Sequence, residues 1–254
     1  MSLLIHGATV VTSLASVAVA RLDVEVDAGR VVVLAPALDG RGPALDATGC
    51  VLIPGNVNAH MHAYSALARG MPHRLAPPTN FREILERVWW RLDRALDAYA
   101  IRASAFVAAR EALLSGTTTL IDHHASPNAI DGSLETIART FDEAGVRSVL
   151  AYEVSDRDGM ERAAAGVREN ERFLTHVAGG AFPLARAMVG AHACFTLSDE
   201  TLADCAALAR DTQTGLHIHV AEDAIDASAV ARLAAAGALN ERTIAAHCVH
   251  VTRD

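Results

Sequence analysis

The sequence predicts an α/β fold: a (β/α)₈ barrel, incomplete with about six units present, preceded by a short all-β segment. From residue 51 onward, short apolar or β-branched runs alternate with helical segments, a pattern typical of parallel sheets. Histidines follow the ends of most of the expected strands, which is where barrel enzymes build their active sites. Residues 1–50 instead carry strand patterns separated by turn signals. These observations divide the chain into segments 1–50 and 51–254.

Residues 2–11 and 17–35 are expected to form strands. The stretch Asp27-Ala28-Gly29-Arg30 lies between two valine-rich runs and is a good hairpin turn. Proline and glycine cluster at 36–43 and predict a loop.

The second segment is predicted to repeat strand, loop and helix. The prediction of a long first helix is based on the helical spacing of Ile84, Val88 and Leu92. The prediction of a later helix is based on Ser198 as its N-cap. The expected strands are 51–57, 117–121, 146–152, 187–191, 216–220 and 243–246; the expected helices are 81–114, 134–144, 160–176, 198–210 and 226–236.

The composition excludes several classes of function. The net charge of −8 argues against a nucleic-acid partner. The sequence contains no run of about 18 apolar residues, so it predicts no membrane-spanning helix. All 22 basic side chains are arginine, so Schiff-base chemistry, a P-loop lysine and a carboxylated-lysine metal bridge have no residue to carry them. Four scattered cysteines without a CxxC motif indicate a reducing, cytoplasmic location.

Three histidines are the candidate metal ligands. His60 and His62 stand two positions apart at a strand end, so both imidazoles can face the barrel axis. His219 closes the fifth expected strand. Catalytic zinc sites typically use three protein ligands and a water, and neutral imidazole is a preferred ligand.

Two further residues are the candidate catalytic groups. Glu222 follows His219 by three positions and suits a proton shuttle, although a helix-capping role is the plain alternative. His247 ends the sixth expected strand and can stabilise developing charge by hydrogen bonding. We prefer it to His250, which falls further into the loop.

Substrate contact is assigned to His192, His124 and Trp90. His192 and His124 follow expected strands, and a structural histidine is the alternative for His192. Trp89 and Trp90 are adjacent in the long helix and point about 100° apart, so one is expected in the core and the other at the substrate entrance.

Several segments of the sequence resemble those of a known family. Residues 54–62, 115–119, 217–222 and 246–250 are together similar to the amidohydrolase superfamily, and within it to the cytosine deaminase, guanine deaminase and chlorohydrolase-like branch. Residues 64–71, 89–93 and 122–127 resemble a narrower group, the aminohydrolases linked with selenium metabolism.

The resemblance implies a distorted barrel with a small β-sandwich assembled from both chain ends, residues 1–50 supplying its N-terminal half. It implies His60, His62 and His219 as ligands of one divalent ion, with zinc expected and iron or manganese as alternatives. Glu222 and His247 are then catalytic partners, and the absence of lysine agrees with the mononuclear branch.

The chain departs from the family pattern at its end. The family places an essential aspartate after the eighth strand, and this sequence stops at Asp254, before that strand. We therefore expect either a fragment of a longer protein or a catalytically incomplete chain, with open sheet edges that favour a homo-oligomer.

The predicted function is hydrolytic deamination, or related non-peptide C–N cleavage, of a small nitrogen-rich substrate by metal-activated water. A pseudoenzyme and a cyclic amidase of the same superfamily are the alternatives. The missing lysine argues against the usual two-metal form of the amidase.

Overall fold

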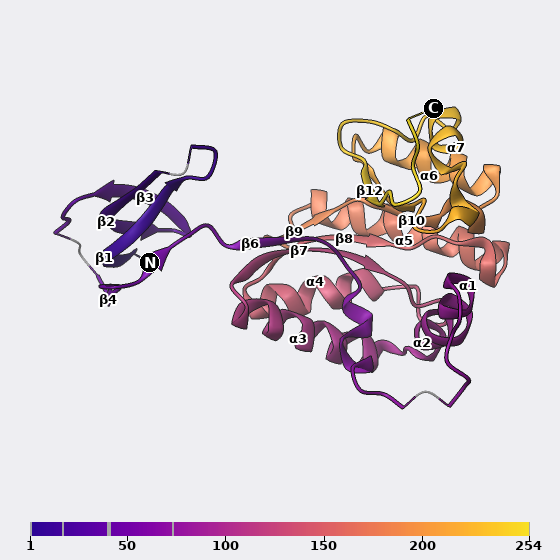
Figure 1. Ribbon diagram of the computed structural model, residues 1–254, viewed down its shortest axis with the longest axis horizontal. Coiled ribbons are helices and arrows are strands. Elements are labelled where there is room, and N and C mark those ends of the chain that lie inside the picture. The colour runs from indigo at the N-terminus through magenta and orange to yellow at the C-terminus, as the bar shows by residue number, and fades with distance from the viewer. Residues whose placement is uncertain (1, 17, 40–41, 73, 254) are drawn as a thin grey trace. The chain divides into compact units, whose positions relative to one another are not determined.

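The computed structural model describes residues 2–16, 18–39, 42–72 and 74–253. The chain divides into two compact units, Met1–Gly55 and Asn56–Asp254, which we describe one at a time (Figure 1).

The first unit is a five-stranded sheet of order β3-β2-β1-β4, with β5 also paired to β1. Its strands are β1 (Ser2–Ser13), β2 (Ala18–Asp27), β3 (Arg30–Ala35), β4 (Ala44–Asp46) and β5 (Val51–Leu52). The predicted hairpin is confirmed: Asp27 pairs with Arg30, and Ala28 and Gly29 both take positive φ (47° and 76°), as a type I′ turn requires. A small core of Ala8, Val10, Val24 and Ala47 holds this sheet together.

The strand expected over 51–57 is divided between the two units. Val51–Leu52 pairs with β1, whereas the first strand of the second unit is β6 (Asn56–Met61). Pro54, which has no N–H to donate, and Gly55 lie between them and interrupt the pairing.

The strands of the second unit are β6, β7 (Thr117–His124), β8 (Arg147–Tyr152), β9 (Ala185–Ala187), β10 (Val189–Ala193), β11 (Leu216–Val220) and β12 (Ile244–His247). They form two parallel sheets, one of order β6-β7-β8-β9 and one of order β10-β11-β12. β9 pairs with β8 and β10 pairs with β11, so the strand predicted over 187–191 is divided between the adjoining edges of the two sheets. A parallel bridge between Val154 and Ala191 continues the pairing across the junction.

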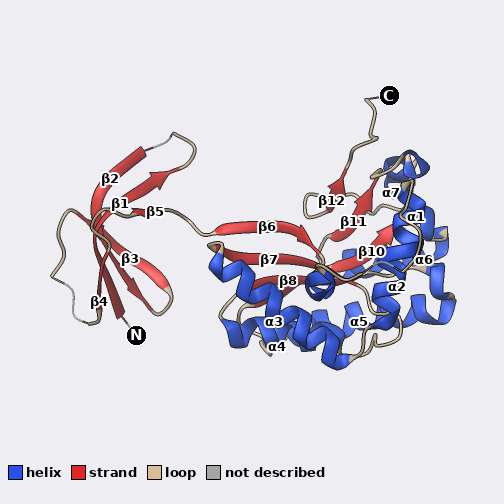
Figure 2. Ribbon diagram, turned by 60° about the horizontal axis from the view of Figure 1, so that its bottom comes forward, coloured by secondary structure: helices blue, strands red, loops and turns tan. Residues whose placement is uncertain are grey.

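The predicted succession of six parallel strands with intervening helices is therefore confirmed. Figure 2 shows α3 (Ala98–Leu114), α4 (Ser133–Ala144) and α5 (Met160–Ala178) lying along one face of the sheet. α6 (Asp199–Asp211) and α7 (Ala229–Ala235) follow β10 and β11, and Ser198 caps α6 as expected. Among the described residues, no helix is both long and apolar enough to cross a membrane.

The long helix predicted over 81–114 is wrong as a single element. The chain forms α1 (Phe81–Ile84), a π-helical turn (Leu85–Trp89), α2 (Trp90–Leu92) and a 3₁₀ turn (Asp93–Ala95) before α3. Leu96 leaves the helical region with ψ 135°, and the Asp97 carboxylate then accepts a hydrogen bond from the Ala100 N–H at 2.8 Å. The Asp97 cap begins a new helix, so the chain forms separate helical segments although the apolar spacing is that of one continuous helix.

A buried asparagine of α5 joins the third and fourth strand positions. The Oδ1 atom of Asn170 accepts hydrogen bonds from the Tyr152 and Gly190 N–H groups at 2.9 and 3.2 Å, and its Nδ2 donates to the Tyr152 carbonyl at 2.9 Å. Only glycine fits at 190, because a Cβ there would lie 2.3 Å from the Tyr152 carbonyl oxygen. This contact fixes the strand ends that lead to Glu153 and His192.

Candidate metal centre and active site

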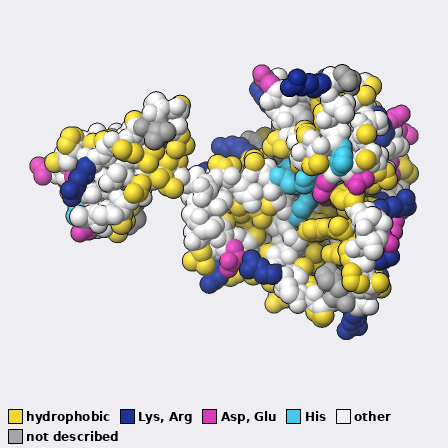
Figure 3. Space-filling model, in the orientation of Figure 1, with side chains coloured by type: hydrophobic (Ala, Val, Ile, Leu, Met, Phe, Trp, Pro, Cys, Tyr) yellow, Lys and Arg dark blue, Asp and Glu magenta, His cyan; other side chains and the backbone are white. Residues whose placement is uncertain are grey.

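A cavity of about 250 Å³ opens at the carboxyl ends of the strands. Figure 3 shows histidines gathered in this hollow of the second unit, with acidic groups beside them and apolar side chains around them. Its lining residues are His60, Met61, His62, Tyr64, Phe81, Ile84, Leu85, Trp89, Trp90, Glu153, Arg157, His192, His219, Glu222 and His247.

The three predicted metal ligands lie together in this cavity. The imidazole centroids of His60, His62 and His219 are 5.0 to 5.2 Å apart. The Nδ1 atoms of His62 and His219 lie 2.7 and 2.8 Å from the backbone carbonyls of His123 and His192. A carbonyl can only accept, so each Nδ1 carries the proton and each Nε2 presents a lone pair. These two Nε2 atoms are 3.3 Å apart.

His60 reaches the same place from β6. Its Nδ1 atom lies 2.8 Å from Nε2 of His217, and its buried Nε2 atom has no hydrogen-bond partner among the described residues. Burial lowers the pKa of His60 to about 4, helped by the neighbouring His62 and His247, and burial also holds the pKa of His219 well below its usual range. The His60 and His219 imidazoles are therefore neutral at physiological pH, the state in which histidine binds metal.

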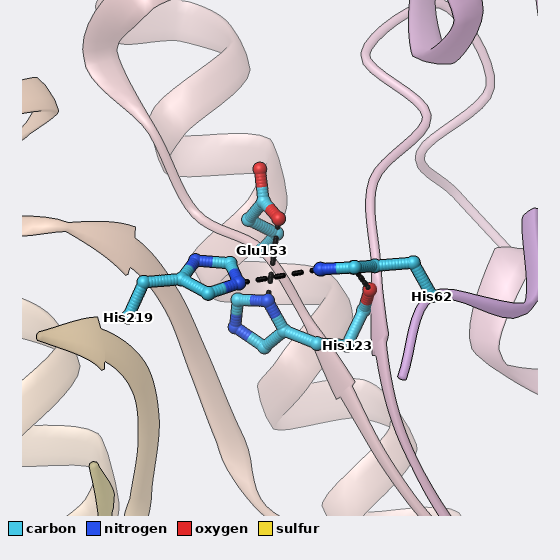
Figure 4. A group of neighbouring side chains, drawn as sticks. All are labelled: His62, His123, Glu153 and His219. Atoms are coloured by element: carbon cyan, nitrogen blue, oxygen red, sulfur yellow. Dashed lines mark hydrogen bonds and ion pairs between the residues drawn. The ribbon is translucent and has the colours of Figure 1, made fainter. Parts of the chain in front are cut away.

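Two buried groups extend this histidine cluster, and both were missed as site residues. His123 and Glu153 join His62 and His219 in a group whose ligand atoms all lie within 4.8 Å of one another (Figure 4). Glu153 directly follows β8, so the strand-end rule that picked out the histidines points to it as well. In the sequence, a lone glutamate at a strand end resembles an ordinary solvated carboxylate.

The two predicted catalytic groups face each other at the rim. Nε2 of His247 lies 3.5 Å from Oε2 of Glu222, and both side chains are about one-third exposed. Burial raises the pKa of Glu222, opposed in part by His247. Ala221, His247 and Cys248 all have positive φ (47°, 74° and 54°), a strained backbone that is common at functional sites.

The predicted substrate-contacting residues are placed differently from one another. His192 and Trp90 line the cavity, with Nδ1 of His192 2.6 Å from the Thr196 hydroxyl. His124 does not line it: its side chain is fully buried, and its Nε2 lies 3.0 Å from the Ser126 hydroxyl. β7 extends through His124, so side chains alternate and His123, not His124, faces the metal ligands.

Both tryptophans line the cavity, and Trp89 also packs against the hydrophobic core, as the sequence predicted for one of the two. Trp89 lies 5.6 Å from the His62 ring and Trp90 lies 6.2 Å from the His192 ring, measured between centroids. The π-helical turn ends between them and holds an extra residue, which changes the direction of the side chains that follow.

Trp89 and Trp90 form an aromatic wall of the cavity, and a buried ion-pair network contacts this wall at Trp90. The Arg157 guanidinium lies 2.5 Å from the Asp93 carboxylate, 3.6 Å from Glu153 and 5.3 Å from the Trp90 ring centroid. Burial raises the pKa of Asp93 to about 6, against the lowering effect of Arg157. Neither Arg157 nor Asp93 was singled out from the sequence.

The donor set fits a divalent cation. Two Nε2 lone pairs, from His62 and His219, face each other with no proton between them, and the buried Nε2 of His60 meets no hydrogen-bond partner in the part of the chain that the structure describes. A cation placed between them removes this repulsion, and neutral imidazoles with their outer N–H groups on carbonyls are how proteins prepare zinc ligands.

Comparisons with known proteins agree with this geometry. A 5'-deoxyadenosine deaminase of Methanothermobacter thermautotrophicus is 34% identical over 81% of this chain and 48% of its own length. A 5-methylthioadenosine/S-adenosylhomocysteine deaminase of Archaeoglobus fulgidus is 31% identical over 89% of this chain and 54% of its own. The chain thus spans about half the length of the curated relatives it matches.

Solved structures share the fold. A zinc-bound adenosine deaminase from Xanthomonas campestris superposes with a TM-score of 0.82 at 24% identity, covering 98% of this chain and 58% of that one. Atrazine chlorohydrolase from Arthrobacter aurescens, complexed with zinc, gives 0.77 at 23% identity, covering 97% and 61%. The curated relatives, both deaminases, confirm the predicted deaminase branch, whereas the narrower likeness to selenium-linked aminohydrolases stays a prediction. Residues 51–254 match the amidohydrolase family, and the chain belongs to that family.

Proposed function

We propose that the protein is a metal-dependent aminohydrolase that cleaves a non-peptide C–N bond in a small nitrogen-rich substrate. The observation that carries this proposal is the 3.3 Å approach of the His62 and His219 Nε2 atoms, each with its Nδ1 proton committed to a carbonyl. The names of the relatives support the choice of deamination over other hydrolyses.

His60, His62 and His219 would hold the ion, and we propose zinc, with iron or manganese as alternatives. A divalent ion bound there supplies Lewis acidity and lowers the pKa of the attacking water toward neutrality. Burial lowers the pKa of His60 and His219, which keeps these two imidazoles neutral and their lone pairs available for the ion.

Glu222 moves the proton. Burial raises the pKa of its carboxyl, so it is a better base than an exposed glutamate, and it lines the cavity beside His247. It takes a proton from the attacking water and delivers it to the leaving nitrogen. His247, with Nε2 3.5 Å from Glu222, lies at the rim where it can stabilise the charge that develops on the substrate.

The cavity wall favours a flat substrate. Trp89 and Trp90 present two indole rings, and His192 offers a ring nitrogen at the same cavity. The cavity volume of about 250 Å³ lies just below the roughly 300–1,000 Å³ usual for ligand sites and suits a single heterocycle. We propose an amino-substituted heterocycle, such as the purine of an adenosine derivative or a triazine.

Ammonia release tests the proposed function. The purified protein, freed of metal and then given Zn²⁺, is incubated with adenosine derivatives, guanine, cytosine and amino-triazines while ammonia is measured. We expect release from at least one substrate class and its loss on chelation. If no substrate yields ammonia, or if activity is indifferent to metal, the proposed function is wrong.

The remaining assignments are proposals of the same kind. We propose that residues 1–50 form the N-terminal half of a composite sandwich. A small-molecule partner and a cytoplasmic location fit the acidic net charge of −8 and the four free cysteines.

A further inference from the structure

His217 is a fully buried histidine to which the roles proposed above give no function. It stands in β11 two positions before His219, so both side chains point to the same side of the sheet. Its Nε2 atom lies 2.8 Å from Nδ1 of His60, and the two ring centroids are 5.0 Å apart. Its own Nδ1 atom is buried and unpartnered. Among the described residues, the contact with His60 is therefore the only hydrogen bond that the His217 ring makes.

The position of one proton in this contact decides whether His60 can bind a metal ion. Two ring nitrogens 2.8 Å apart share a single proton, which can belong to either ring. If His217 donates it, the neutral His60 ring carries its own proton on Nε2 and has no lone pair there. If His60 donates it, Nε2 of His60 is free to bind the ion. Metal binding by His60 therefore requires His217 to be the acceptor, with its own proton on Nδ1.

The other two predicted ligands are held by the backbone instead. Nδ1 of His62 donates to the carbonyl of His123 in β7, and Nδ1 of His219 donates to the carbonyl of His192 in β10. A carbonyl can only accept, so the position of the proton on these two rings is fixed. His60 lies in the sheet of β6 but depends on a side chain of β11, which belongs to the other sheet. Of these three outer contacts, this one is made by a side chain, so a substitution can remove it.

We propose that His217 is a positioning residue: it accepts the Nδ1 proton of His60 and so directs the Nε2 lone pair of His60 toward the metal ion. This inference rests on the proposed function only in requiring a divalent ion bound by His60, His62 and His219. It adds no protein ligand, so the position of the attacking water stays open.

Metal affinity tests the role of His217 without relying on activity. The metal-free wild-type protein and its variants are titrated with Zn²⁺ against a competing chelator. His217→Leu removes the acceptor and should weaken Zn²⁺ binding by about 10–100-fold, the usual cost of losing an outer hydrogen-bond partner. His217→Gln should lose less than about 10-fold, because its amide oxygen takes the place of Nε2 and accepts the same proton.

His217→Asn is the matched control for this rescue. Its amide is one methylene shorter than that of glutamine and reaches the position of Nδ1 rather than Nε2. It should therefore bind Zn²⁺ about as weakly as His217→Leu, and circular dichroism of the metal-free proteins checks that each variant is folded. Nitrogen-15 NMR of the Zn²⁺-loaded wild-type protein gives a second readout, in which Nδ1 of His60 should carry the proton shared with His217.

The outcomes separate this inference from the proposed function. His217 does not position His60 if folded His217→Leu or His217→Asn binds Zn²⁺ as wild type does, or if His217→Gln loses as much affinity as they do. The inference also fails if the NMR spectrum places the shared proton on Nε2 of His217. In each of these cases, a wild-type protein that binds Zn²⁺ and releases ammonia keeps the proposed function. If the wild-type protein binds no ion, both the inference and the metal-dependent function are wrong.

Discussion

Replacing Asn170 by alanine tests whether one buried amide holds the strand ends that carry the site. The substitution leaves the Tyr152 and Gly190 N–H groups without the Oδ1 acceptor that they share. Each buried donor left unpaired costs about 1–3 kcal/mol, so the variant should lose about 4 kcal/mol of folding free energy. For a chain of this size that corresponds to a melting temperature lower by about 8–16 °C.

Thermal unfolding followed by circular dichroism measures this loss. Glu171→Ala is the matched control, since Glu171 is the next residue of α5 and is exposed, and it should stay within about 0.5 kcal/mol of wild type. If Asn170→Ala melts together with this control, Asn170 does not hold the third and fourth strand positions together and the reasoning is refuted.

Three other substitutions probe separate features. Glu222→Gln should lower kcat by about 10²–10⁴ while Zn²⁺ content stays unchanged; equal loss of metal would make Glu222 a ligand instead of a proton carrier. Gly190→Ala should destabilise the fold by about 3 kcal/mol in urea unfolding, because its Cβ meets the Tyr152 carbonyl at 2.3 Å; wild-type stability would show that the strand yields freely. Arg157→Leu leaves Asp93 buried without its partner and should cost about 3–5 kcal/mol, and no loss would mean that the pair contributes little.

The sequence carried enough information for the six strand positions and for the strand ends that hold histidines. Apolar runs separated by helical segments leave few alternatives to a parallel sheet, and carboxyl ends of parallel strands meet at one edge. His60, His62 and His219 therefore come together as predicted.

The sequence did not reveal that His123 and Glu153 lie at the candidate site. Their placement depends on where a strand ends and on which groups surround a buried charge. His123 and His124 are equivalent in sequence, but β7 runs through both, so alternation sends one toward the ligands and the other toward Ser126. Glu153 becomes a candidate site residue only because the fold buries it beside His123 and brings Arg157 within 3.6 Å. Neither condition is visible in a local pattern.

Because of the π-helical turn at Leu85–Trp89, the direction in which Trp90 points depends on the number of residues in this segment as well as on their identity. A π-turn holds one residue more than the α-helical turn it replaces, and each α-helical residue rotates the chain by about 100°. Deleting a single residue within this turn would let the helix run on regularly and would turn Trp90 away from the cavity without altering any aromatic side chain. Homologues that differ by one residue in this segment would therefore present a different wall to their substrates, so a length change here can shift specificity as effectively as a substitution.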